Sequence, residues 1–119
     1  MDKNTKILIA DDSSFMRKVL KGILEGEGFS DFIECENGKE CLEAFRKETP
    51  GIVFLDVVMP EVDGLEVLRR IGGQAKIIMV SAVGQEKVIN EAKELGASGY
   101  ITKPFNWKEV ADEAKKVLS

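Results

Sequence analysis

Five short apolar runs, spaced about two dozen residues apart, constrain the fold of this chain more than any other feature. Each run has the length of a strand and is bounded by polar or turn-forming residues. The runs are ILIA from Ile7, FSDFIEC from Phe29, IVFL from Ile52, KIIMV from Lys76 and GYIT from Gly99. The sequence therefore predicts five strands.

The segments between and after the runs have the 3.6-residue periodicity of amphipathic helices. The apolar positions are Phe15, Met16, Val19, Leu20, Ile23 and Leu24 in the first segment, and Val110, Ala111, Ala114, Val117 and Leu118 in the last. Glycines that tolerate positive φ close several segments, at Gly26, Gly28, Gly72, Gly73 and Gly96. Alternating strands and helices favour an α/β fold, a doubly wound five-stranded parallel sheet covered on both faces. A chain of 119 residues predicts one domain, residues 1–119.

The polarity of the runs indicates which strands lie at the edges of the sheet. The first, third and fourth runs are continuously apolar, as expected for strands covered on both faces. The second run contains Ser30, Asp31 and Glu34, and the short fifth run begins with Gly99. We therefore expect the second and fifth strands at the edges.

The composition excludes several classes of protein. No apolar stretch approaches the ~18 residues that a membrane span needs, and the start MDKNTKILIADD does not resemble an export signal, which predicts a cytoplasmic protein without membrane insertion. A net charge of −4 argues against a nucleic-acid partner. We interpret the basic groups as solvated helix faces; they are Arg17, Lys18, Lys21, Arg69 and Arg70.

Cysteine and histidine usage narrows the chemistry further. Cys35 and Cys41 do not form a CxxC pair, and a reducing compartment favours free thiols. The chain has no histidine, so a histidine metal site or catalytic triad is excluded. Any site must use other side chains.

Residues with complementary chemistry follow four of the five predicted strands. Asp11 and Asp12 follow the first run, Asp56 ends the third, Ser81 follows the fourth and Lys103 follows the fifth. The carboxyl ends of parallel strands share one edge of the sheet, so these residues are expected to be neighbours. Each alone has an ordinary explanation as a helix cap, a turn residue or a surface lysine, but their coincidence favours a site.

Three carboxylates at one edge require a cation. Two like charges ~4 Å apart repel by about 4 kcal/mol at an effective dielectric near 20. Lys103 can offset one charge, and the oxygen ligands that remain suit a hard divalent ion such as Mg²⁺. The metal would also explain why Asp56 interrupts the apolar segment VFLDVVMP.

Taken together, these motifs resemble the receiver domain of two-component response regulators, over the whole chain. The matching features are the pair Asp11 and Asp12, the LDVVMPEVDG segment around Asp56, Ser81 with its following alanine, and the KPF that begins at Lys103. The resemblance implies the flavodoxin-like (βα)₅ receiver fold with strand order 2-1-3-4-5, the order known for CheY.

The resemblance also implies roles for individual residues. Asp56 is expected to be the phosphoacceptor, and Lys103 with the metal to stabilise the transferring phosphoryl group. Asp11, Asp12, Asp56 and the backbone carbonyl of Val58 are the expected Mg²⁺ ligands, Asp11 acting through water. Ser81 and Tyr100 match the pair that switches on phosphorylation.

Other features gain meaning from the same resemblance. The Lys103–Pro104 peptide is expected to be cis, as in many relatives. Pro60, Asp63 and Gly64 would shape the turn after Asp56, with Gly64 in a conformation that most residues avoid. On sequence alone Tyr100 is interpreted as a half-buried edge aromatic, and Trp107 as either partner-facing or packed. Val58 stands where several chemotaxis relatives carry a polar residue, and in the family this side chain influences how fast the acyl phosphate hydrolyses.

Within the family, DDSSFMRKVL and SAVGQE resemble CheY-like chemotaxis receivers. No output domain is expected to follow, so we expect a monomeric, non-enzymatic switch that catalyses only its own phosphorylation and dephosphorylation. Its expected partners are a CheA-type histidine kinase, a flagellar or archaellar motor switch or adaptor protein, and a phosphatase. The partner-binding face is expected on the fourth helix, the fifth strand and the fifth helix, as in relatives.

Other functions are weighed against this interpretation. The nearest alternative is a phosphorelay intermediate that passes its phosphoryl group to a histidine phosphotransfer protein, and a degenerate receiver that binds partners without phosphorylation is a further one. An FMN carrier shares the topology, but DDSS would repel a flavin phosphate. A haloacid dehalogenase-type phosphohydrolase requires a second aspartate where Val58 stands.

Overall fold

The computed structural model describes residues 3–119 and has the alternating order that the apolar runs predict. The elements are β1 (Lys6–Ala10), α1 (Ser14–Gly26), β2 (Asp31–Cys35), α2 (Gly38–Glu48), β3 (Ile52–Leu55), α3 (Gly64–Ile71), β4 (Lys76–Ser81), α4 (Glu86–Glu94), β5 (Gly99–Thr102) and α5 (Trp107–Leu118). Each of the five apolar runs contributes one strand.

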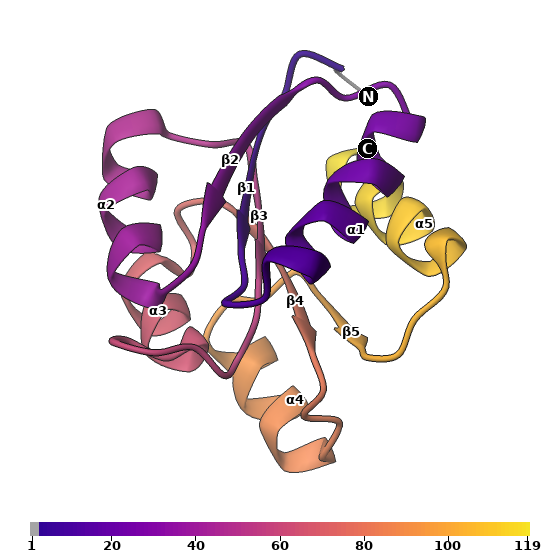
Figure 1. The fold of residues 1–119 in the computed structure, drawn as a ribbon. Helices are drawn as coiled ribbons and strands as arrows, with labels where there is room; N and C mark the ends of the chain where they lie inside the picture. Colours follow the sequence, from indigo (N-terminus) through magenta and orange to yellow (C-terminus); the bar gives the residue numbers. More distant parts are fainter. Residues whose placement is uncertain (1–2) are drawn as a thin grey trace.

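The five strands form one parallel sheet in the order β2-β1-β3-β4-β5, as expected (Figure 1). β2 and β5 occupy the edges, which confirms the interpretation of their polar residues. β1, β3 and β4 lie between them, and β3 is buried at each of its four positions. The apolar character of the central strands is therefore explained by cover on both faces.

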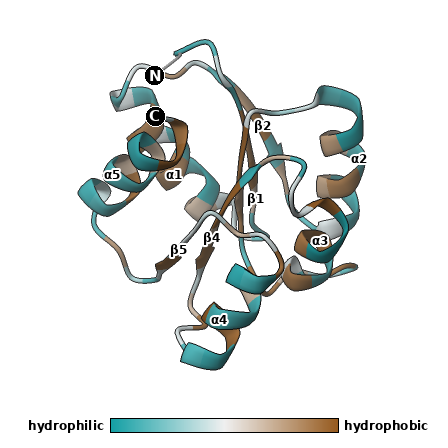
Figure 2. Ribbon diagram, turned by 180° about the vertical axis from the view of Figure 1, so that it is seen from behind, coloured by the Kyte–Doolittle hydropathy of each residue, from teal (hydrophilic) through white to brown (hydrophobic). Residues whose placement is uncertain are grey.

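Helices cover both faces of the sheet (Figure 2). On one face, Leu20 and Leu24 of α1 and Val110 of α5 pack against β1, β3 and β4. On the other face, residues of α2, α3 and α4 pack against alternate side chains of the same strands, including Leu42 and Val67. No helix among residues 3–119 is long and apolar enough to cross a membrane.

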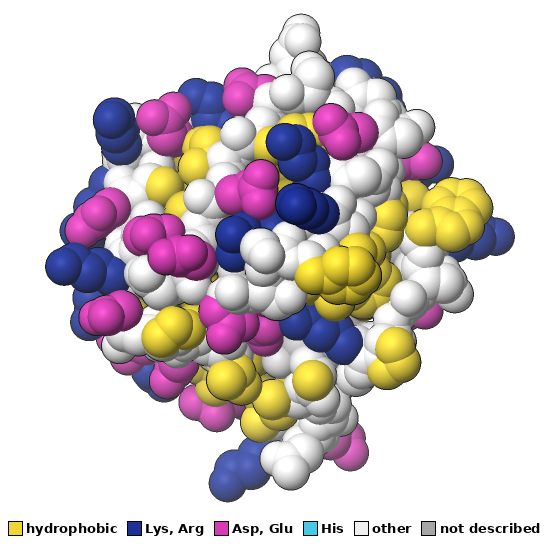
Figure 3. All heavy atoms as spheres, in the orientation of Figure 1, with side chains coloured by type: hydrophobic (Ala, Val, Ile, Leu, Met, Phe, Trp, Pro, Cys, Tyr) yellow, Lys and Arg dark blue, Asp and Glu magenta, His cyan; other side chains and the backbone are white. Residues whose placement is uncertain are grey.

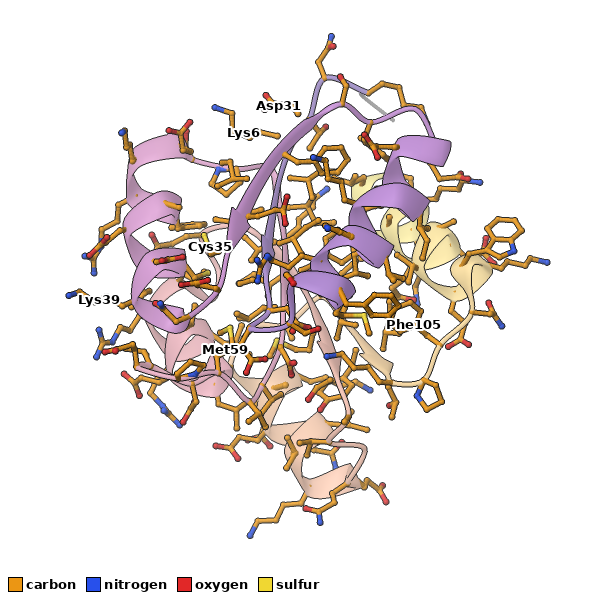
Figure 4. All side chains as sticks on the ribbon, in the orientation of Figure 1. Lys6, Asp31, Cys35, Lys39, Met59 and Phe105 are labelled. Carbon is orange, nitrogen blue, oxygen red and sulfur yellow. The ribbon has the colours of Figure 1, made fainter. Side chains whose placement is uncertain are left out.

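The parallel register aligns the strand ends that carry chemistry. Ala10 pairs with Leu55 across β1 and β3, so Asp11 and Asp56 each follow their strand at the same level. Ser81 pairs with Thr102 across β4 and β5, next to Lys103. At the amino ends of the strands, Lys6 of β1 pairs with Asp31 of β2, and both side chains project at the end of the sheet far from Asp11 and Asp56 (Figure 4).

The structure corrects one detail of the helical prediction, at Phe15, and decides between the two interpretations of Trp107. Phe15 was expected on the apolar face of α1, but 71% of it is exposed because it lies in the first turn, ahead of the turns that pack onto the sheet. Trp107, at the start of α5, is 63% exposed and is therefore not a core residue. Hydrophobic side chains are accordingly visible on the surface near α1 and α5 (Figure 3).

The free thiols are confirmed, and positive φ is confirmed at three of the five predicted glycines, whereas Gly26 is still helical and Gly72 has a φ of −56°. Gly28, Gly73 and Gly96 have φ values of +100°, +85° and +109° after their helices. Cys35 and Cys41 are free and buried in the core beneath α2, where the side chain of Cys35 lies between β2 and that helix (Figure 4).

Candidate functional site

The carboxyl edge of the sheet brings together the residues that follow β1, β3 and β5. The Lys103 Nζ donates to Asp11 Oδ2 at 2.8 Å and to Asp56 Oδ2 at 2.9 Å. Asp11 is 92 residues from Lys103 in sequence, so only the sheet topology makes this contact. The Lys103 N–H also donates to the Ser81 carbonyl at 2.9 Å, which places the end of β4 beside the lysine.

Asp11 and Asp56 are buried carboxylates with fixed hydrogen bonds. They are 1% and 7% exposed. Asp11 Oδ1 accepts from the Ser13 N–H at 2.9 Å, and Asp56 Oδ1 accepts from the Val58 N–H at 3.2 Å. Each carboxylate therefore has one oxygen held by the following loop and the other held by Lys103, which restricts rotation of both groups.

The backbone at these positions continues the sheet beyond the named strands. The Asp11 N–H donates to the Cys35 carbonyl at 3.1 Å, and the Asp56 N–H donates to the Ala10 carbonyl at 3.0 Å. Both aspartates consequently start from rigid strand ends and point their side chains from a fixed backbone. The ends of β1 and β3, rather than loops, therefore set the geometry of the cluster.

Burial and charge act in opposite directions on the ionisable groups. Burial raises the pKa of the Asp11 carboxyl, and the Lys103 ammonium counteracts that rise. Burial lowers the pKa of Lys103, but its hydrogen bonds to Asp11 and Asp56 outweigh burial and raise the pKa overall. Lys103 is therefore a fixed cation at neutral pH.

The edge carries a set of oxygen ligands that fits a hard divalent cation. Carboxylate oxygens of Asp11, Asp12 and Asp56 all lie within 4.8 Å of one another. Lys103 offsets one of the three negative charges, and a divalent cation would balance the remainder. Asp12 is exposed, which leaves one side of the cluster open to water and to a ligand.

The loop after Asp56 is positioned by a close backbone contact at Gly64. A Cβ at Gly64 would lie 1.9 Å from the Asp56 carbonyl oxygen, and the Gly64 N–H donates to the Val57 carbonyl at 2.7 Å. The expected special conformation of Gly64 was therefore wrong, because this glycine is required by space. The positive φ in the loop, 69°, occurs at Glu61.

Ser81 and Tyr100 meet at the backbone of Val83. Ser81 is fully buried, and its Oγ accepts from the Val83 N–H at 3.2 Å. The Tyr100 hydroxyl donates to the Val83 carbonyl, and burial raises the pKa of this hydroxyl. Tyr100 is half-buried on the edge strand β5, as its sequence position predicts. One short loop thus connects the serine at the site with the aromatic at the surface.

The remaining expected features are present or newly apparent. The Lys103–Pro104 peptide is cis, as expected. The Val58 residue is 63% exposed and follows Asp56 by two positions. That its carbonyl binds Mg²⁺ stays a prediction. Arg17 was interpreted as a solvated residue, but its side chain is only 14% exposed and its Nη1 donates to the Asp11 carbonyl at 2.7 Å. The sequence carries no signal for this contact.

Two polar surface hollows lie elsewhere on the molecule. One, of about 310 Å³, is formed around the start of α2 and includes Asn37 and Glu61. The other, of about 480 Å³, lies on α4 and includes Lys87 and Glu91. Neither includes a residue of the carboxylate cluster, so the chemistry is placed by the cluster and not by the size of a pocket.

The fold and the site together define a class of protein. The sheet and its lysine-bridged carboxylate cluster are those of a doubly wound α/β protein, a class in which ligands bind at the carboxyl ends of the strands. The family model described as "Response regulator receiver domain" matches residues 7–115. The chain therefore belongs to the response regulator receiver family and is a CheY-like receiver.

Individual relatives agree with this assignment. The chain is 40% identical to "Chemotaxis protein CheY" of Bacillus subtilis over 117 residues, which cover 96% of this chain and 98% of that protein. It is 39% identical to "Sporulation initiation phosphotransferase F" of the same organism, over 97% of this chain and 94% of that protein. A crystal structure of a CheX–CheY–BeF₃–Mg²⁺ complex from Borrelia burgdorferi is similar, with a TM-score of 0.92 and 31% identity over 97% of this chain and 90% of that chain.

Proposed function

We propose that Asp56 accepts a phosphoryl group in a Mg²⁺-dependent reaction and that the phosphorylated form signals by binding a partner protein. The observation that carries this proposal is the Lys103 ammonium bridging the buried carboxylates of Asp11 and Asp56 inside a cluster of three aspartates. The expected phosphodonor is the phosphohistidine of a CheA-type kinase or a small acyl phosphate. The expected cofactor is Mg²⁺.

The chain's own groups would prepare Asp56 for attack. The Val58 N–H and the Lys103 ammonium hold its two oxygens, so the carboxylate needs little reorganisation before it reacts. An Asp56 carboxylate oxygen forms a bond to phosphorus while the bond from phosphorus to the donor's imidazole nitrogen breaks. The electron pair of that bond leaves with the imidazole. Lys103 remains as a cation beside the transferring phosphoryl oxygens.

The three aspartates, with the Val58 carbonyl, are the groups that would hold the ion. Asp12 and Asp56 are the proposed direct carboxylate ligands, and Asp11 is the proposed ligand through water, as the resemblance to receiver domains implies. When bound, Mg²⁺ would neutralise charge on the phosphoryl oxygens. The open, water-facing side at Asp12 is consistent with an ion that keeps several waters.

The proposed switch uses the connection from Ser81 to Tyr100. The Ser81 hydroxyl lies at the carboxyl edge and can donate to a phosphoryl oxygen on Asp56. Rotation of the Ser81 side chain toward that oxygen would lengthen its present contact with the Val83 N–H and so act on the loop that also accepts from Tyr100. Moving a two-state population from 1:99 to 99:1 takes only ~5.5 kcal/mol, which one covalent event can supply.

We infer that the output is chemotaxis control through a flagellar or archaellar motor switch or adaptor protein, on the α4–β5–α5 face. The similarity to CheY proteins supports this inference. A CheX-type protein, as in the Borrelia complex, is a candidate partner. The exposed Val58 beside Asp56 is the proposed determinant of acyl phosphate lifetime.

A second candidate function is that of a phosphorelay intermediate. The similarity to a sporulation phosphotransferase at nearly the same identity as to CheY favours it. The two functions differ in what phosphorylated Asp56 does next. Transfer of the phosphoryl group to a histidine phosphotransfer protein supports the relay, whereas binding to a motor component supports the chemotaxis role.

Intact-mass spectrometry tests the shared first step. Incubation with acetyl phosphate and Mg²⁺ should add one phosphoryl group, and Asp56→Asn should abolish the adduct. Asp63→Asn is the matched control, because Asp63 lies in the same loop as an exposed cap of α3, a position at which asparagine is equally suitable. Absence of an adduct on the wild-type protein, or an undiminished adduct on Asp56→Asn, would refute the proposal.

A further inference from the structure

Arg17 connects three elements next to the carboxylate cluster. Its Nη1 donates to the Asp11 carbonyl at 2.7 Å, and its Nε donates to Glu34 Oε1 at 3.1 Å. Arg17 lies in α1, Asp11 follows β1, and Glu34 lies in the edge strand β2. The forked guanidinium therefore reaches from the edge strand to the loop that carries Asp11 and Asp12. A lysine ammonium cannot reproduce this two-sided contact.

The Asp11 carbonyl depends on this contact. It lies past the last residue of β1 and before α1, and no backbone N–H among residues 3–119 donates to it. The Asp11 N–H, in contrast, is fixed by the Cys35 carbonyl of β2. The Asp11 N–H is thus held by β2 directly, and the Asp11 carbonyl is held by Arg17, which is itself bound to Glu34 of β2. These contacts give the peptide that follows Asp11 one defined orientation.

The orientation of the Asp11–Asp12 peptide determines the position of the Asp12 carboxylate. The Asp12 side chain is exposed and has no hydrogen bond within the described part of the chain, so nothing but its backbone positions the carboxylate. The carbonyl that Arg17 holds belongs to the Asp11–Asp12 peptide. Rotation of this peptide would swing the Asp12 carboxylate out of the cluster with Asp11 and Asp56.

We propose that Arg17, oriented by Glu34, is a positioning residue for the ion site: it fixes the Asp11–Asp12 peptide and so pre-organises Asp12 for Mg²⁺. This inference rests on the Mg²⁺-dependent phosphorylation proposed above. Groups that orient metal ligands from behind typically contribute 10–100-fold to metal affinity, and Arg17 occupies such a place. It does not touch the phosphoryl group and is not a catalytic residue.

A simple charge effect makes the opposite prediction. Arg17 is a cation, so its removal would strengthen binding of a second cation if only charge mattered. Under that alternative, Arg17→Met binds Mg²⁺ more tightly and Arg17→Lys, which keeps the charge, is unchanged. The positioning role predicts weaker binding in both variants, since both lose the fork.

Calorimetric titration of the metal-free protein with Mg²⁺ separates the two. We expect Arg17→Lys and Arg17→Met to raise the Mg²⁺ Kd by about tenfold or more. Lys21→Met is the matched control, because Lys21 is a cation of the same helix that lies 3.9 Å from Glu34 and makes no bond to Asp11. Its Kd should stay unchanged. An unchanged Kd in Arg17→Lys, or a lower Kd in Arg17→Met, overturns the inference.

Two further measurements guard against a merely structural effect. The Mg²⁺ concentration that half-saturates phosphorylation should rise about tenfold in Arg17→Lys, while the rate at saturating Mg²⁺ stays within about twofold of wild type. The Asp12 amide resonance of the metal-free protein should shift in Arg17→Lys and not in Lys21→Met. If the wild-type protein is not phosphorylated, the proposed function fails. If the wild-type protein is phosphorylated but the Arg17 variants bind Mg²⁺ as tightly as it does, only this inference fails.

Discussion

Replacing Lys103 with methionine tests the electrostatics of the site in the absence of any ligand. The substitution keeps most of the side-chain volume but removes the cation between Asp11 and Asp56, whose carboxylates are almost fully buried. The burial of Lys103 itself offsets much of its direct attraction to the aspartates. The substitution leaves two buried carboxylates without their counterion, and the repulsion between them sets a scale for the cost.

The geometry gives the size of that cost. At the 4.8 Å that bounds the separation of the carboxylate oxygens, two unit charges repel by about 3.5 kcal/mol at an effective dielectric near 20. The protein can instead protonate one carboxyl group. For an ordinary aspartate pKa of about 3.9, this costs about 4 kcal/mol at pH 7 but only about 1.5 kcal/mol at pH 5. Lys103→Met should thus lose about 3.5 kcal/mol at pH 7 and about 1.5 kcal/mol at pH 5.

The sign of the pH dependence follows from proton binding. In the variant, one carboxyl pKa of the folded protein is raised above its unfolded value, so the folded state binds the extra proton. Its stability relative to wild type therefore falls as the pH rises from 5 to 7. Excess Mg²⁺ should restore much of the loss at pH 7, because the ion replaces the missing positive charge.

Urea unfolding at both pH values, with and without Mg²⁺, measures these effects. Lys6→Met is the matched control, since Lys6 forms an ion pair with Glu48 at 2.9 Å that is partly open to water at the opposite edge of the sheet. It should change stability little, equally at both pH values and without response to Mg²⁺. Equal destabilisation of Lys103→Met at pH 5 and pH 7, without recovery by Mg²⁺, would refute the electrostatic reasoning.

Three other predictions concern different parts of the molecule. Gly64→Ala should destabilise the protein by roughly 3 kcal/mol in urea unfolding because its Cβ would overlap a backbone oxygen, whereas Gly22→Ala, with open space around it, should stabilise it by about 0.5 to 1 kcal/mol; equal effects would contradict the close contact. Burial raises the pKa of Cys35 to about 11 and of Cys41 to about 12, so iodoacetamide at pH 8 should alkylate both thiols only after unfolding, and rapid labelling of the native protein would argue against their burial. Beryllofluoride with Mg²⁺ should shift the NMR resonances of Tyr100, and an unchanged spectrum there would remove it from the switch.

The fold was predictable because the polarity of the residues in each strand reflects how deeply that strand is buried. The unbroken apolar runs of β1, β3 and β4 and the polar residues of β2 indicated which strands are central and which are edges. The meeting of Asp11 with Lys103 followed from topology alone, since parallel strands end at one edge. Residue type and periodicity were sufficient for both.

Contacts that depend on spatial distance were not predictable in the same way. Phe15 fits the apolar periodicity of α1 but lies in a turn that does not reach the sheet. Gly64 was correctly singled out for the wrong reason, because the sequence does not reveal how closely the Asp56 carbonyl approaches. Arg17 has the sequence pattern of a solvated helix face, and only its contacts in the structure, with the Asp11 carbonyl and with Glu34, distinguish it from Lys18.

In the proposed function, the carboxyl edge of the sheet makes one particular aspartate, Asp56, the nucleophile toward phosphorus. Borohydride reduces an acyl phosphate to an alcohol, which converts a phosphorylated aspartate into homoserine. After phosphorylation with Mg²⁺ and a phosphodonor, peptide mapping should find homoserine at residue 56 and aspartate at 11, 12 and 63. Homoserine at any of the other three positions in place of 56, or at none of the four, would rule out Asp56 as the phosphoacceptor.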